Sequence, residues 1–155
     1  KKLTVKQNLI VYAKLYNVEN ISERIDYLSS TLKLDNFMNS LTGELSSGQK
    51  NRVSLAKSLI NEPSVLLLDE PTASLDPETG NFIRSFLEDY IKQKKISILL
   101  ASHNMEEVKR LCTSVMMMKS GRIIDQGRPK DLIEKHGRKN LEEVFLKLAK
   151  VENEF

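Results

Sequence analysis

Two short runs of consecutive apolar residues constrain the fold most. Residues 65–68 in "VLLLDEP" show no alternation between polar and apolar side chains, and residues 96–102, "ISILLAS", are predicted to form a second buried strand. Such runs are typical of parallel strands that are buried on both faces. Between them, residues 77–91 carry an apolar stripe at helical spacing, preceded by Asp76 as a helix cap. A strand, a helix and a second strand in this order predict an α/β fold.

The first third of the chain is predicted to be helical. Thr4 and Gln7 form a T-x-x-Q capping box, which marks the start of a helix. Residues 21–32 have the spacing of a second amphipathic helix, and a third is expected to follow "SSGQ" and run to Leu59. We therefore divide the chain into three parts. These are a helical part at 1–62, a core portion at 63–127 and C-terminal helices at 128–155.

The last third is predicted to form a hairpin and further helices. The N-x-x-E pattern from Asn104 to Glu107 caps a helix, and "VMMMKSGRIIDQG" indicates a strand, a glycine turn and a return strand. The methionine triplet is assigned to core packing, because adjacent strand residues point to opposite faces and cannot share a metal ion. Asp125 and Gln126 are interpreted as ordinary strand-end residues, and His136 as a surface residue.

Composition excludes several classes of protein. The net charge is +3 with charges of both signs dispersed, which does not favour a nucleic-acid partner. The single cysteine, Cys112, excludes an internal disulfide and suits a reducing compartment, where it is expected to be a buried structural thiol. No apolar run approaches the length of a membrane span. The absence of an initial methionine suggests a piece of a longer protein.

Polar side chains follow both predicted strands. Asp69 and Glu70 end the first strand, and His103 comes directly after the second. Ligands of open α/β sheets bind beyond the carboxyl ends of the strands, so these three residues are candidates for a functional site.

The stretch "TGELSSGQKNR" resembles a phosphate-binding loop only in spacing. Gly43 and Gly48 are separated as in G-x-x-x-x-G-K-[ST], but Gln49 stands where the lysine should be and no strand precedes the loop. We interpret it instead as the start of a helix. The free amides of the first turn and the positive end of the helix dipole suit an anion there.

Four phrases together resemble the ATP-binding subunits of ABC transporters. "LSSGQ" at 45–49 is similar to the signature motif and "VLLLDEP" at 65–71 to the Walker B strand. "SLD" at 74–76 is similar to the D-loop, and "ASH" at 101–103 to the segment with the switch histidine. The resemblance covers essentially the whole chain, and its two ends look most like subunits that serve export-type permeases. It implies a partial P-loop NTPase fold, with a mostly parallel sheet flanked by helices and a helical subdomain on the N-terminal side.

The resemblance implies a role for each matching residue, with ATP and Mg²⁺ as cofactors. Asp69 would hold Mg²⁺ through water. Glu70 would act as the general base that polarises the water attacking the γ-phosphate. His103 would contact that phosphate and orient the same water.

The resemblance also implies a head-to-tail dimer of two ATP-binding subunits, identical or different, on a transmembrane permease at the cytoplasmic face of the membrane. Asp76 would reach the other subunit's active site. The signature residues would grip the other subunit's ATP, and one of them departs from the family pattern, since Ser47 replaces a glycine where backbone approaches phosphate. The signature residues are Ser46, Ser47, Gly48 and Gln49.

No G-x-x-x-x-G-K-[ST] motif occurs in the 155 residues. The resemblance places that motif upstream of Lys1, so we expect this chain alone to bind ATP weakly and to be inactive. Two other functions are considered. One is the ATPase head of a chromosome-maintenance or DNA-repair protein, but no sustained heptads appear here. The other is a catalytically silent relative, which the intact Glu70 and His103 argue against.

Overall fold

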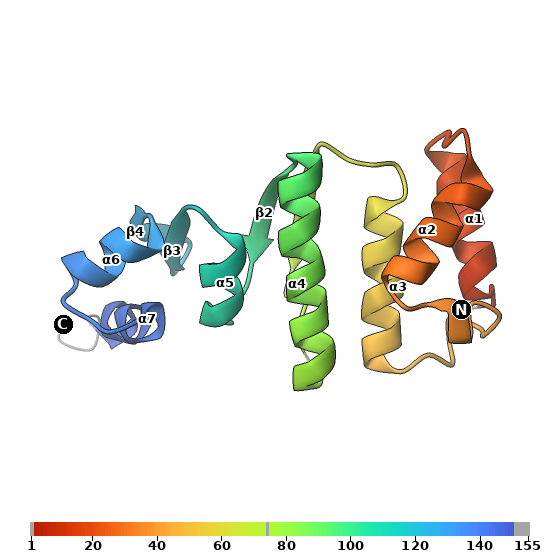
Figure 1. Ribbon diagram of the computed structural model, residues 1–155. Helices are drawn as coiled ribbons and strands as arrows, with labels where there is room; N and C mark the ends of the chain where they lie inside the picture. The colour runs from red at the N-terminus through yellow and green to blue at the C-terminus, as the bar shows by residue number, and fades with distance from the viewer. Residues whose placement is uncertain (1, 74, 151–155) are drawn as a thin grey trace. The chain divides into compact units, whose positions relative to one another are not determined.

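The structure is a computed structural model that describes residues 2–73 and 75–150 (Figure 1). Helices and strands alternate after an all-helical beginning, which confirms the predicted α/β class. The chain divides into two compact units, residues 1–101 and residues 102–155, and each is described by itself. The predicted three-part division of the chain remains a prediction.

The first unit begins with helices that pack on one another (Figure 1). They are α1 (Val5–Leu15), α2 (Ile21–Thr31), the short 3-10 helix η1 (Asp35–Phe37) and α3 (Ser47–Leu59). The predicted capping box of α1 is confirmed, since the Gln7 amide donates to Thr4 Oγ1 at 3.2 Å and the Thr4 amide to Gln7 Oε1 at 2.9 Å. The apolar stripes predicted from the sequence face inward and form the core of this unit. Its buried members include Leu9, Ala13, Ile25, Leu28, Leu32, Val53, Ala56, Leu59 and Ile60.

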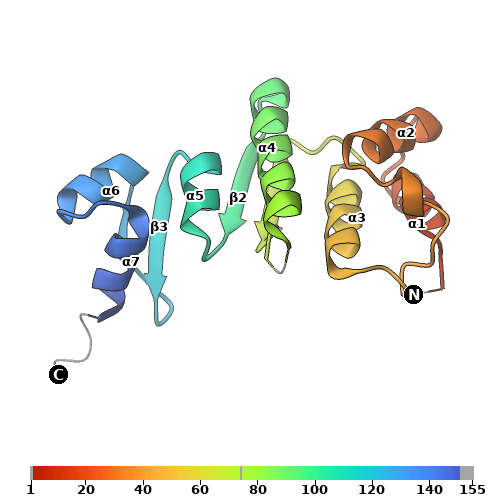
Figure 2. The same ribbon diagram turned by 60° about the horizontal axis from the view of Figure 1, so that its bottom comes forward.

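A parallel strand pair with its connecting helix completes the first unit. β1 (Val65–Asp69) pairs with β2 (Ser97–Ala101), with Leu67 opposite Leu99 and Asp69 opposite Ala101. Between them runs α4 (Pro77–Lys94), and Figures 1 and 2 both show it beside β2. This strand–helix–strand unit confirms the predicted order of elements.

The prediction that both strands are buried on both faces is wrong. Leu66 of β1 is only 3 % exposed, but Val65 is 55 % exposed, Leu67 70 % and Leu99 57 %. Among the described residues the sheet has two strands, and these three side chains form one uncovered apolar face. Continuous apolar runs indicate that a strand is suited to apolar contacts on both faces, but in the described residues no element packs closely on the face that carries Leu67.

The second unit consists of a hairpin and three helices. The antiparallel strands pair around Gly121, which has a φ of 74° that glycine adopts without strain. Figure 2 shows β3 beside α6 and α7. The elements are α5 (Met105–Leu111), β3 (Val115–Lys119), β4 (Arg122–Gly127), α6 (Pro129–Lys135) and α7 (Leu141–Lys150). The core of the unit contains Val108, Met117, Leu132, Leu141 and Val144.

The methionine triplet only partly follows its prediction. Met117 is 4 % exposed and lies in the core, whereas Met116 and Met118 are 52 % and 60 % exposed on the opposite face of the strand. The prediction of core packing is therefore correct for Met117 and wrong for Met116 and Met118. Cys112 is half-buried, and burial, with the nearby Glu107 charge as a second cause, raises the pKa of its thiol. Within the described residues, no helix combines the length and apolar character needed to cross a bilayer.

The interpretation of His136 as a surface residue is wrong, and Asp125 is not an ordinary strand-end residue. The Asp125 side chain is 9 % exposed and that of His136 is 12 % exposed, and their Oδ2 and Nε2 atoms are 2.6 Å apart. Lys135 Nζ donates to both Asp125 oxygens, at 2.8 and 3.0 Å. The hydrogen bonds from Lys135 and then His136 lower the pKa of Asp125 to about 2. The contacts join the end of α6 to β4, a tertiary arrangement that local sequence does not reveal.

This carboxylate predicts a specific acid sensitivity. A lowered folded-state pKa means that Asp125 stabilises the fold above about pH 4 and that this contribution is lost as the pH falls towards 2. At pH 7 we expect Asp125→Asn to reduce the free energy of unfolding by about 1–3 kcal/mol. Denaturant unfolding of both proteins between pH 7 and pH 2 should show the difference shrinking to zero at the acid end.

The matched control for this experiment is Asp131→Asn. Asp131 pairs with Arg128 at 2.7 Å, but both side chains are more than half exposed. We expect a loss of less than about 1 kcal/mol from this change. A pH-independent difference between wild type and Asp125→Asn would contradict the assignment.

Candidate functional site

The signature residues form the first turn of α3, and their side chains cap that helix. Gln49 N donates to Ser46 Oγ at 3.2 Å, and Ser46 N donates to Gln49 Oε1 at 2.9 Å. This S-x-x-Q box is the same pattern as the T-x-x-Q box of α1, so the sequence could have revealed it. Because the box uses the amides of Ser46 and Gln49, the first-turn amides left to face an anion are those of Ser47 and Gly48.

The signature turn lies close to the segment predicted to be the D-loop. A Cβ atom added to Gly48 would lie 3.6 Å from Leu75 Cδ2, which is an ordinary van der Waals distance. Ser74, the first residue of the predicted D-loop, lies outside the described residues. Asp76, the last, is the N-cap of α4 and accepts from Thr79 N at 2.9 Å, as predicted. That hydrogen bond lowers the pKa of Asp76.

Asp69 and Glu70 end β1 in different ways. Asp69 is the last residue of the strand, and Glu70 N donates to Ala101 O at 2.9 Å, which continues the strand pairing by one bond. Glu70 has a φ of 46°, in the left-handed region that side-chain-bearing residues rarely adopt. Strained backbone of this kind often occurs at functional sites. The chain therefore changes direction at Glu70, the predicted general base.

A cavity of about 250 Å³ separates the signature helix from the end of β1. Four residues of α3 line one wall, and the other wall includes Asp69 and the strand-end leucines. The lining residues are Asn51, Ser54, Leu55, Ser58, Leu67, Leu68, Asp69 and Pro71. One carboxylate, two hydroxyls and an amide provide oxygen ligands, which suits Mg²⁺ held mainly by waters and phosphate oxygens. No cluster of three or more His, Cys, Asp or Glu occurs in residues 2–73 and 75–150, so an all-protein metal cage is not what these residues offer.

His103 is the second residue of the second unit and is exposed. It precedes α5, whose N-cap Asn104 accepts from the amides of Glu106 and Glu107 at 3.1 and 3.2 Å. The N-x-x-E box predicted here is only half formed. The Glu107 side chain accepts from Ser102 Oγ at 2.6 Å, and the Asn104 amide donates to Ser102 Oγ at 3.1 Å. Ser102 therefore stands between the two residues of the expected box.

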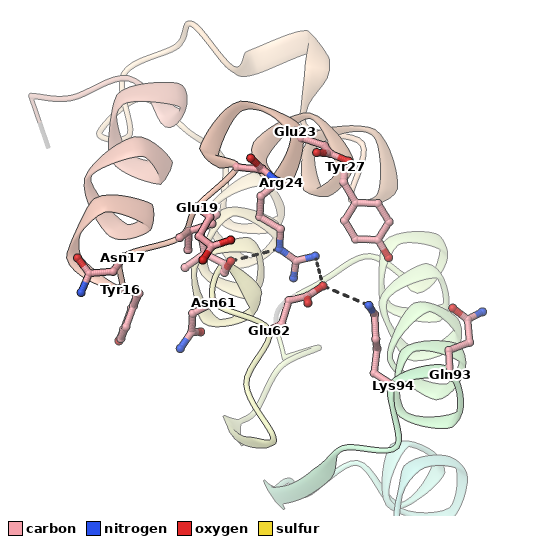
Figure 3. A pocket seen from close by; sticks show the side chains of 13 residues that line it. Tyr16, Asn17, Glu19, Glu23, Arg24, Tyr27, Asn61, Glu62, Gln93 and Lys94 are labelled. Atoms are coloured by element: carbon pink, nitrogen blue, oxygen red, sulfur yellow. Dashed lines mark hydrogen bonds and ion pairs between the residues drawn. The ribbon is translucent and has the colours of Figure 1, made fainter.

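A separate surface pocket of about 700 Å³ lies in the first unit (Figure 3). None of the predicted site residues lines it. Arg24 lines this pocket, and its guanidinium donates to the main-chain oxygens of Leu59 and Ile60 at the end of α3. Arg24 also pairs with Glu62 at 2.9 Å, and Glu62 accepts from Lys94 at 3.2 Å. Sequence reasoning missed this network because its members come from three distant segments.

Comparison with known proteins supports the resemblance. The family profile described as "ABC transporter" matches residues 1–73. The ABC transporter ATP-binding protein NatA of Bacillus subtilis (strain 168) is 37 % identical over 147 residues, which cover 94 % of this chain and 59 % of NatA. By these matches the chain is similar to the ATP-binding subunits of ABC transporters. The Nod factor export ATP-binding protein I of Rhizobium etli is 38 % identical over 86 % of this chain and 42 % of its own length. The chain thus spans about half the length of these curated ABC relatives.

Solved structures agree with this similarity. The structure titled "Structure of ATP binding subunit of ABC transporter" has a TM-score of 0.81 at 27 % identity, covering 96 % of this chain and 63 % of that one. A dimeric ATP-binding cassette, MJ0796, bound to ADP and Pi has a TM-score of 0.66 at 25 % identity, covering 72 % of this chain and 48 % of that one. The fold is therefore that of part of an ABC ATPase subunit, as predicted.

Proposed function

We propose that this chain is the later part of a subunit that hydrolyses ATP to power transport across a membrane. The observation that carries this proposal is the end of β1. There Asp69 and Glu70 are adjacent, Glu70 has a φ of 46°, and its amide donates to Ala101 O at 2.9 Å. The similarity to this family gives these two carboxylates their chemistry. The matched relatives are named as transporter ATP-binding proteins, which favours transport over the chromosome-maintenance alternative.

In this proposal each residue has one task. Asp69, at the edge of the 250 Å³ cavity, would hold Mg²⁺ through water. Glu70 would accept a proton from the attacking water. His103 would contact the γ-phosphate. Mg²⁺, when bound, neutralises charge on the phosphate oxygens. The chain's own residues supply position and proton transfer.

The proposal includes two partners. A second ATP-binding subunit would face this one, with the amides of Ser47 and Gly48 and the residues Ser46, Gln49 and Asp76 directed at its nucleotide. The dimeric form of the neighbour MJ0796 supports this arrangement. A transmembrane permease would recognise the cargo and hold the subunit at the cytoplasmic face of the membrane. The export function in the name of the R. etli relative supports an export-type permease.

The proposal predicts that the 155-residue chain alone binds Mg-ATP poorly. Its sequence has no G-x-x-x-x-G-K-[ST] loop to cradle the phosphates. We expect a Kd in the millimolar range, or about −4 kcal/mol of binding free energy, by isothermal titration calorimetry. The comparison is a complete polypeptide in which a P-loop precedes these residues, where micromolar binding and ATP turnover are expected. Micromolar binding by the 155-residue chain would contradict the proposed division of labour.

A further inference from the structure

The residues on either side of His103 are joined by a closed set of polar contacts within the second unit. Ser102 Oγ donates to Glu107 Oε2 at 2.6 Å and accepts from Asn104 N at 3.1 Å. Asn104 Oδ1 in turn accepts from Glu107 N at 3.2 Å. We call Ser102, Asn104 and Glu107 the clasp. His103 lies between the first two members of the clasp, and its own side chain is exposed.

Glu107 occupies an unusual position for a carboxylate. Its residue exposure is 0 %, and the next residue, Val108, belongs to the apolar core of the unit. Only one of its side-chain oxygens is used, because Oε1 is buried and accepts no hydrogen bond in the described part of the chain. A buried acceptor without a donor is unfavourable, and an apolar side chain of similar volume would avoid that penalty. Stability alone therefore does not explain a glutamate here.

The hydrogen bond with Ser102 links Glu107 to the residue before His103. In an ordinary capping box the glutamate would accept directly from the Asn104 amide. Here Ser102 is inserted between them, so Glu107 draws the residue before His103 towards the first turn of α5. The Ser102 side chain and the Asn104 amide, on the two sides of His103, are thus both linked to the first turn of α5. A side chain that projects from a segment fixed at both ends has little freedom beyond its own rotamers.

We propose that Glu107 is the positioning residue for His103, acting through Ser102. The inference rests on the proposed function, in which His103 contacts the γ-phosphate. Glu107 itself touches no substrate in this arrangement. It fixes the orientation of the histidine. The rate depends on that orientation because small displacements of reacting groups reduce rates strongly.

The positional part of the proposal is tested by nuclear magnetic resonance on the 155-residue chain. Glu107→Met keeps the volume but removes the acceptor, whereas Glu107→Gln keeps an acceptor for Ser102. We expect amide exchange at Asn104 to become at least about tenfold faster in Glu107→Met and to stay within about twofold of wild type in Glu107→Gln. The chain has two histidines, so the His136 signals report on whether the rest of the unit is intact.

The matched control is Glu106→Gln, which changes an exposed glutamate in the same helical turn. It should leave exchange at Asn104 unchanged. Wild-type exchange at Asn104 in a folded Glu107→Met protein would overturn the proposal. If Glu107→Met does not fold, Ser102→Ala breaks the same link from the other side, and unchanged exchange in that variant would overturn it equally.

The catalytic part is tested by ATP turnover in the complete polypeptide. We expect kcat to fall between about tenfold and about 100-fold in Glu107→Met, with KM for ATP within about twofold, and to recover in Glu107→Gln. The variant His103→Ala distinguishes the proposed role of His103 from the proposed role of Glu107. Wild-type turnover in His103→Ala would overturn the proposed role of His103. Unchanged turnover in Glu107→Met beside a loss in His103→Ala would overturn this inference alone.

Discussion

Replacing Glu70 with glutamine in the complete polypeptide should abolish ATP turnover while leaving the fold intact. A general base contributes about 10²–10⁴ to the rate, and the amide cannot accept the proton from water. Glutamine has the same shape and the same backbone preferences, so the φ of 46° at this position is neither relieved nor worsened. Turnover is measured by phosphate release, and thermal unfolding checks that stability is retained.

Asp89→Asn is the control for this change. Asp89 is an exposed carboxylate on α4 outside the predicted site, and its loss should leave turnover unchanged. ATP binding by Glu70→Gln should persist, because the proposed base acts on water and does not hold the nucleotide. Turnover at the wild-type rate in Glu70→Gln would remove Glu70 from the catalytic role.

Replacing Arg24 with methionine should give the largest loss of stability outside the apolar core. The change removes donors to the oxygens of Leu59 and Ile60, which have few other partners at a helix end. It also leaves Glu62 without its partner at 2.9 Å. The Arg24 side chain is 11 % exposed, so solvent replaces these contacts poorly. We expect the free energy of unfolding to fall by about 2–4 kcal/mol, measured by urea denaturation.

Lys94→Met provides the comparison, because it removes the other cation that pairs with Glu62. The Lys94 side chain is 44 % exposed and that of Glu62 is 53 % exposed, so the pair is well solvated. Its loss should change the free energy of unfolding by less than about 1 kcal/mol. Equal losses from the two variants would show that the helix-end oxygens do not depend on Arg24.

Local patterns predicted most of the secondary structure. The Thr4 capping box, the cap at Asp76 and the two apolar runs each act over a few residues, and all appear where the sequence indicates. Burial was harder to predict. Arg84 is 8 % exposed and donates to Thr72 Oγ1 at 3.4 Å, although it lies on a helix face that also carries charged residues. Tertiary neighbours decide such positions, and neither spacing nor composition contains them.

At the candidate site, too, local features were predicted and features that depend on further contacts were not. Asp69 and Glu70 were identified by their place after a strand, and the α/β rule that found them concerns topology alone. The strained backbone at Glu70 and the insertion of Ser102 into the cap of α5 were not predicted. Both depend on contacts in the folded chain that the local sequence patterns do not specify. The S-x-x-Q box at Ser46 was not predicted, although it acts over only four residues and follows the same pattern as the box at Thr4.

The uncovered face of the β1–β2 pair has a consequence for how a cell handles this polypeptide. Val65, Leu67 and Leu99 form an apolar patch beside strand edges that no other described strand occupies. Surfaces of this kind are what chaperones bind in newly made proteins and what aggregation exploits. The 155-residue chain by itself should therefore aggregate more readily than a longer polypeptide in which another segment covers that face.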